Sequence, residues 1–228
     1  MSDANVLALT CGKEEVAFHE AGHAAIELMN GHAPQLILIR DTGPEWVGDC
    51  YLCAPTDRAH SGRRARMAVA GALSQARFVA ERHLQMEATL DLRSNAEKLV
   101  EFFLSAPRDE ARCPVTWSDA SGRSVAVDLV GGYSGPDYLH FWFEVTALAV
   151  AVSPGSTFVA DSPICQAAAR DVVARCVATL ADRFVWRHIR ALAEELLNAA
   201  PTTVQMVGRG KIEGKAGILY GYQPPEET

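Results

Sequence analysis

The segment from Lys13 to Asn30 constrains this chain most, because it places two histidines four residues apart on one predicted helix. It contains the sequence Phe-His-Glu-Ala-Gly-His, in which His19 and His23 enclose Glu20 and two small residues. No proline interrupts the segment, and Gly31 suits the position that follows a helix C-terminus. Residues four apart lie on the same face of a helix, so both imidazoles can reach one metal ion.

This spacing indicates a zinc site. Neutral imidazole nitrogens are good ligands for Zn²⁺, and H-E-x-x-H on a helix is typical of metallopeptidases, in which the glutamate is the general base. We predict that His19 and His23 bind Zn²⁺. Glu20 would take a proton from a metal-bound water and later pass it to the leaving amine. The competing interpretation is a helix that carries two histidines and an unrelated glutamate.

A catalytic zinc ion usually has a third protein ligand. The extended pattern H-E-x-x-H-x-x-G-x-x-H is excluded, because Ile26 stands at its glycine and Met29 at its third histidine. Asp41 follows a predicted strand within the turn sequence D-T-G-P, and turn capping explains it better. The third ligand must therefore come from elsewhere in the chain.

Three segments resemble FtsH-type (M41) zinc peptidases. The sequence EEVAFHEAGHAAIEL is similar to the start of that protease domain. The sequence MAVAGALSQARFVAE resembles the family's G-G-R-x-A-E-E region, although Ala-Gly-Ala at 70–72 replaces G-G-R and Gln-Ala at 75–76 replaces the paired acids. Residues 186–197 resemble the C-terminal end of the domain.

The resemblance implies that the third ligand is an aspartate near the start of a later helix. The nearest equivalent segment is SPGSTFVADSPICQAAARD, which makes Asp161 the candidate. Asp171, on the same predicted helix, is the next choice, and Asp91 is the third. An aspartate before Ser-Pro is also an ordinary helix N-cap, and capping alone would explain Asp161.

The remaining sequence predicts an α+β protein that is mainly α-helical. Apolar residues at helical spacing predict helices at about 61–88, 94–106, 161–184 and 182–200. Short apolar runs predict strands at 35–40 and 46–55. The alternating, aromatic sequence of 113–152 predicts a three-stranded antiparallel unit.

The long separation between His23 and Asp161 predicts an insertion. Removing about residues 94–158 would restore a spacing like that of the M41 family. We therefore expect a single metallopeptidase-like domain over 1–228, with a zincin-like helical core and a β-rich insertion at 94–158. The insertion would cover the cleft, form a specificity wall or bind a protein partner.

Composition narrows the class of protein. Hydrophobic residues make up 49% of the 228 residues, which is enough for a sizeable core. The chain has 28 acidic and 21 basic residues, and this balance argues against nucleic acid as a partner. No run approaches 18 apolar residues and no signal-peptide pattern opens the chain, so we expect a cytoplasmic protein without a membrane-spanning segment.

The predicted function is zinc-dependent hydrolysis of peptide bonds in peptides or unfolded segments. The sequence lacks the G-x-x-x-x-G-K-[ST] motif of an AAA+ module, so we expect a stand-alone enzyme without an unfolding motor. An extended peptide would pair with the strand at 35–40. The alternative is a catalytically inactive, zinc-stabilised interaction or regulatory protein, which the loss of G-G-R and the paired acids favours. A fold remnant without metal is the third interpretation.

Overall fold

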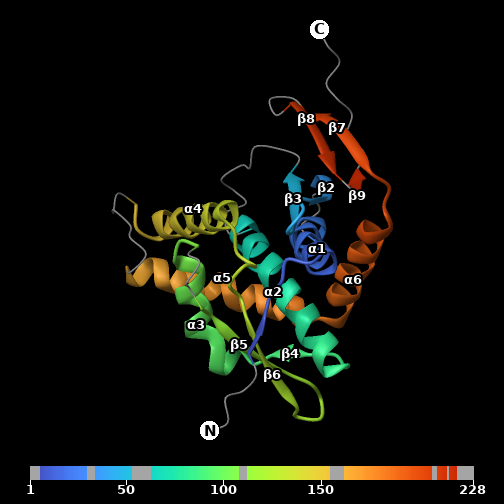
Figure 1. Ribbon diagram of the computed structural model, residues 1–228. Coiled ribbons are helices and arrows are strands. Elements are labelled where there is room, and N and C mark those ends of the chain that lie inside the picture. Colours follow the sequence, from blue (N-terminus) through green and yellow to red (C-terminus); the bar gives the residue numbers. More distant parts are fainter. Residues whose placement is uncertain are drawn as a thin grey trace.

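The computed structural model describes residues 6–29, 34–52, 63–107, 112–154, 162–206, 210–214 and 216–219. Over these residues the chain is an α+β protein with six helices and small sheets, so the prediction of a mainly helical α+β fold is confirmed (Figure 1). The helices are α1 (Lys13–Met29), α2 (Arg63–Leu84), α3 (Leu92–Leu104), α4 (Gly135–Val152), α5 (Pro163–Ala181) and α6 (Arg183–Asn198). The strands are β1 (Val6–Ala8), β2 (Pro34–Asp41), β3 (Trp46–Leu52), β4 (Thr89–Leu90), β5 (Pro114–Ser118), β6 (Ser124–Asp128), β7 (Thr202–Met206), β8 (Gly210–Gly214) and β9 (Ala216–Leu219).

Helices α1 and α2 form the centre of the molecule. Helix α6 packs on one side of α1, while α4 and α5 pack against α2 (Figure 1). Small residues let the two central helices approach closely, since a Cβ at Gly22 would lie 2.6 Å from the carbonyl oxygen of Ala70. The fully buried alanines of this pair are Ala17, Ala21, Ala24, Ala25, Ala65, Ala68, Ala70, Ala72, Ala76 and Ala80.

Strand β2 lies inside an antiparallel sheet of order β3-β2-β9. Its residues Leu36 to Ile39 are all buried, as expected for a strand that is covered on both faces. The prediction that the strand at 35–40 is exposed for peptide pairing is therefore wrong, because β3 and β9 occupy its two edges. Within the described residues, β3 is at the edge of this sheet instead.

A second sheet has the order β1-β6-β5-β4, in which β1 runs parallel to β6 and the other pairs are antiparallel. The hairpin of β5 and β6 fulfils part of the three-stranded unit predicted at 113–152. The third strand is wrong, because residues 135–152 form helix α4. Phe141, Val145 and Ala149 recur at four-residue spacing and are fully buried, so tertiary packing outweighs the strand propensity of this β-branched and aromatic sequence.

The segment predicted as an insertion, 94–158, contributes to the main hydrophobic core. Phe103 of α3, Val127 of β6 and Phe141 of α4 belong to the same cluster as Ala21 and Leu73 of the central helices. Its description as an insertion stays a prediction. Among the described residues, no helix has both the length and the apolar character needed to cross a membrane.

Candidate metal centre

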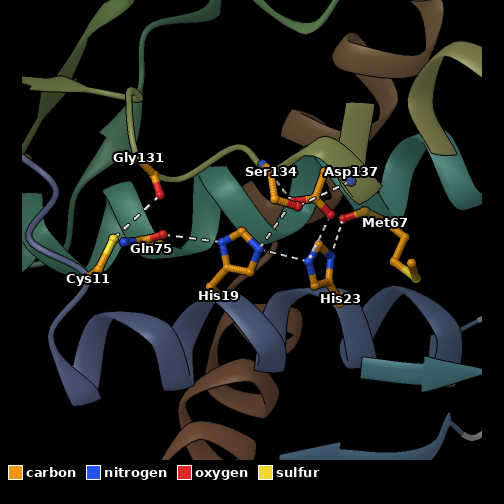
Figure 2. Close-up of polar contacts among 8 residues, drawn as sticks. All are labelled: Cys11, His19, His23, Met67, Gln75, Gly131, Ser134 and Asp137. Carbon is orange, nitrogen blue, oxygen red and sulfur yellow. Dashed lines mark hydrogen bonds and ion pairs between the residues drawn. The ribbon is translucent and has the colours of Figure 1, made fainter. Parts of the chain in front are cut away.

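Helix α1 presents His19 and His23 toward α2 and α4, and Glu20 beside them toward strand β3. The Nε2 atoms of the two histidines are 2.8 Å apart, and Figure 2 shows both rings turned to the same point. Glu20 and His23 are each 4% exposed. One ligand atom from each of the three residues lies within 4.8 Å of the others, so this group could hold a metal ion.

Asp137 of α4 completes the arrangement. Its Oδ1 lies 3.4 Å from Nε2 of His23 and its Oδ2 lies 3.6 Å from Nε2 of His19 (Figure 2). The side chain is 8% exposed. Two helices that are far apart in the sequence thus bring two imidazoles and one carboxylate to a single point.

The start of α4 holds this carboxylate in place. Ser134 is the N-cap, and its Oγ accepts a hydrogen bond from the backbone N–H of Asp137. The Asp137 carboxylate in turn accepts from the N–H and the hydroxyl of Ser134, at 3.1 and 2.8 Å. These reciprocal bonds form a capping box, and Pro136 favours the first helical turn. The side chain that faces the histidines is therefore part of the helix start itself.

The donor set fits a tetrahedral metal ion. Nδ1 of His23 lies 2.7 Å from the carbonyl oxygen of Met67; a carbonyl only accepts, so Nδ1 carries the hydrogen and Nε2 has the lone pair. That lone pair faces the Asp137 carboxylate, an arrangement that requires a cation or a proton between them. The candidate ligand atoms of His19, His23 and Asp137 lie 2.8 to 3.6 Å from one another. In a tetrahedral zinc site with metal–ligand distances of about 2.0–2.1 Å, two ligand atoms are expected to lie about 3.3 Å apart, which is within this range.

Gly71 of α2 leaves room for the two rings. A Cβ at this position would lie 2.3 Å from Cε1 of His23 and 2.8 Å from Nε2 of His19. The helix backbone therefore approaches the candidate ligands at a distance that only glycine permits.

Glu20 lies between the histidines and strand β3. A Cβ at Gly48 of β3 would come within 2.4 Å of Oε1 of Glu20. The other carboxylate oxygen, Oε2, is buried and has no hydrogen-bond partner among the described residues. Burial raises the pKa of Glu20 to about 8, although the nearby charge of His19 opposes this shift. The residue is thus a carboxyl group poised to exchange a proton near neutral pH.

The two histidines differ in proton affinity. Burial lowers the pKa of both rings, but for His19 the hydrogen bond and charge of Asp137 outweigh burial and raise the pKa to about 8. For His23 burial prevails, and the pKa falls to about 4. Burial would raise the pKa of Asp137, yet His23 and His19 lower it below its usual range. Without metal, the site therefore holds a proton on His19 at neutral pH.

The three aspartates considered as third ligands have different positions. Asp161 lies outside the described residues. Asp171 is on α5, 55% exposed, and its carboxylate pairs with Arg175. Asp91 is the N-cap of α3 and accepts a hydrogen bond from the N–H of Arg93. The structure does not bring Asp171 or Asp91 to the histidines.

Sequence reasoning missed Asp137, although a signal was present. Ser134, Pro136 and Asp137 have the spacing of a capped helix start, and an aspartate at a helix start was the kind of residue expected as third ligand. The aromatic and β-branched residues that follow Asp137 instead favour a strand, and the prediction of an antiparallel unit over 113–152 rests on them. Because this region was predicted as strand, Asp137 was not recognised as an aspartate at the start of a helix.

No family model, no curated protein and no solved structure matches this chain. The chemistry of the site has to be inferred from its own geometry.

Proposed function

We propose that this protein is a zinc metallopeptidase with a zincin-like helical core similar to that of the M41 family. His19, His23 and Asp137 would hold the zinc ion, and Glu20 would be the general base. One observation carries the proposal: three acceptor groups from α1 and α4 converge within 3.6 Å, next to the buried carboxyl group of Glu20, whose Oε2 has no hydrogen-bond partner among the described residues.

Two imidazoles and a carboxylate suit Zn²⁺, and three protein ligands are typical of catalytic rather than structural zinc sites. When bound, zinc would supply a Lewis acid that polarises a peptide carbonyl and makes water acidic. Glu20 would accept the proton of the attacking water at Oε2 and transfer it to the nitrogen of the leaving amine. Without metal, burial raises the pKa of Glu20 to about 8; the positive charge of a bound metal ion would favour the ionised carboxylate that a general base requires.

The proposed substrate is an extended peptide or an unfolded segment. Strand β3 has β2 on one side and no other strand beside it among the described residues. An extended chain can add to such an edge by backbone hydrogen bonds. Since Gly48 of β3 lies against Glu20, a peptide paired with β3 would pass beside the general base.

The test compares wild-type protein with Glu20→Gln. We expect both proteins to contain about one zinc per chain, while the variant loses peptide cleavage by about 100-fold or more. Elemental analysis measures the metal, and a fluorogenic peptide library measures cleavage. His23→Ala is the matched control, because it should lose both zinc and activity. Wild-type protein that contains stoichiometric zinc but cleaves no peptide would refute the peptidase proposal.

The burial of the site favours a second candidate function, a non-hydrolytic protein in which zinc stabilises the fold. The side chains of His19, His23 and Asp137 are only 12%, 6% and 8% exposed. X-ray absorption of the zinc-loaded protein separates the two functions. A shell of three protein ligands and one water supports the enzyme, and a closed shell of four protein ligands supports the structural role.

A further inference from the structure

The two candidate histidine ligands are held by different acceptors. Nδ1 of His23 is fixed by a backbone carbonyl, that of Met67. Nδ1 of His19 instead lies 3.2 Å from Oε1 of Gln75, a side chain on α2 that is 2% exposed (Figure 2). An amide can present either its oxygen or its nitrogen to a ring. The orientation of the Gln75 amide toward His19 must therefore be set by a second hydrogen-bonding partner.

Glu15 is that second partner. It lies one turn before His19 on α1 and is 2% exposed. Its carboxylate accepts hydrogen bonds of 2.7 Å from both the N–H and the hydroxyl of Thr10, and Nε2 of Gln75 lies 3.5 Å from it. A carboxylate in this setting only accepts, so the nitrogen end of Gln75 must face Glu15.

We propose that Gln75 and Glu15 are positioning residues that select the metal-binding tautomer of His19. Because Glu15 takes the nitrogen end of the amide, Oε1 of Gln75 faces the imidazole and requires the hydrogen on Nδ1. Nε2 of His19 is then left with a lone pair that points to His23 and Asp137. Partners of this kind tune the affinity of a site for its metal.

The loop before α4 also packs against Gln75. A Cβ at Gly132 would lie 3.1 Å from Oε1 of Gln75 and 2.6 Å from Leu9, so the backbone presses against the amide. Gln75 is thus confined by α1, by its own helix and by this loop. The inference rests on the proposed function, since it assigns these residues to the same zinc site.

The first test replaces Gln75 by methionine, which has a similar volume and no amide. We expect the zinc affinity, measured by competition with a chromophoric chelator, to fall about 10- to 100-fold. Ser74→Ala is the matched control, because Ser74 is the buried neighbour on α2 and its hydroxyl has no partner among the described residues. This control should leave the zinc affinity unchanged.

The second test exchanges the two residues. In the double variant E15Q/Q75E, the oxygen of the new amide at 15 accepts from the hydroxyl of Thr10, and its nitrogen donates to the new carboxylate at 75, which accepts from His19. The N–H of Thr10 loses its acceptor, because in the wild type it bonds the same Glu15 oxygen as Gln75, and this loss should lower stability without changing the His19 tautomer. We expect its zinc affinity to return to within about threefold of wild type. Glu15→Gln alone permits the reversed amide, so its affinity should be lower than that of the double variant.

Two further measurements separate positioning from a general loss of stability. Urea unfolding gives the free energy of unfolding of each variant. The order of the zinc affinities among the variants should differ from the order of these free energies. Long-range ¹H–¹⁵N NMR of the zinc-loaded protein should show His19 protonated at Nδ1 in wild type and in the double variant. If wild-type protein binds no zinc, the proposed function itself fails. Wild-type binding with unchanged affinity in Q75M, or a double variant no better than E15Q, overturns this inference alone.

Discussion

His19 and His23 are the same residue type on the same helix face, yet their surroundings give them opposite proton affinities. His23 donates from Nδ1 to a backbone carbonyl and is too buried to ionise readily, with a pKa of about 4. His19 keeps a proton because the Asp137 carboxylate lies beside it, and its pKa is about 8. A metal ion that binds both Nε2 atoms must displace this proton.

Zinc binding should therefore release about one proton from His19 at pH 7 and depend on pH. Because the raised pKa keeps the ring protonated below pH 8, the apparent zinc affinity should fall about tenfold for each pH unit below that value. Calorimetry in two buffers of different ionisation enthalpy counts the protons. Glu20→Gln serves as the control, because the pKa of Glu20 is also about 8 and its proton would be released in the same pH range. Protons that this variant releases on zinc binding do not come from position 20. Affinity that is constant from pH 6 to pH 8 would contradict the prediction.

The residues of α1 were predictable because their relation is local. The four-residue spacing of His19 and His23 follows from the helical repeat, and Glu20 follows from its place between them. Asp137 was not predictable in this way. It reaches the histidines only because α4 packs against α2, and no local repeat encodes that contact.

Helix α4 shows how one element both shapes the fold and supplies the candidate third ligand. Its sequence favours a strand by composition, but the capping box of Ser134 and Asp137 starts a helix, and one face of that helix is buried. The same carboxylate that caps the helix faces the histidines. The stability of this helix start and the geometry of the candidate site are therefore coupled.

Ser134→Ala should reveal this coupling. Loss of the N-cap should lower the free energy of unfolding by about 1 kcal/mol. It should also weaken zinc binding, because Ser134 orients Asp137. Ser162→Ala is the matched control, since Ser162 caps α5 in the same way, with its Oγ accepting from the N–H of Cys165. Equal zinc affinity in the two variants would show that the cap does not position Asp137.

At the scale of the whole molecule, a buried carboxylate on α2 links this helix to α6. Glu81 accepts hydrogen bonds from Nε of Arg77, from the indole N–H of Trp186 and from Arg190. It also accepts from the N–H of Ala88. Arg77 itself is 4% exposed and donates to the carbonyl oxygen of Leu180 on α5. One carboxylate thus neutralises a buried guanidinium where three helices meet.

Glu81→Ala should destabilise the protein by about 3–5 kcal/mol, because it leaves the Arg77 charge buried without its partner. Position 81 is about 15 Å along α2 from Gly71, so the zinc affinity of the folded protein should not change. Urea unfolding and chelator competition measure the two quantities. Glu97→Ala is the control, because its ion pair with Arg170 is exposed on both sides and its loss should affect stability little. A stability loss as small as that of the control would contradict this role of Glu81.

The sequence by itself determined the elements whose signals are local: the α1 helix with His19, Glu20 and His23 on it, the β2 and β3 strands, and a mainly helical α+β fold. Only the tertiary structure decided that residues 135–152 are a helix, that β2 is internal to its sheet, and that Asp137 joins the two histidines. Helical periodicity acts within a few residues, so the sequence displays it directly. The convergence of α1 and α4 depends on which apolar faces are buried together, and that choice is made by the packing of the whole core.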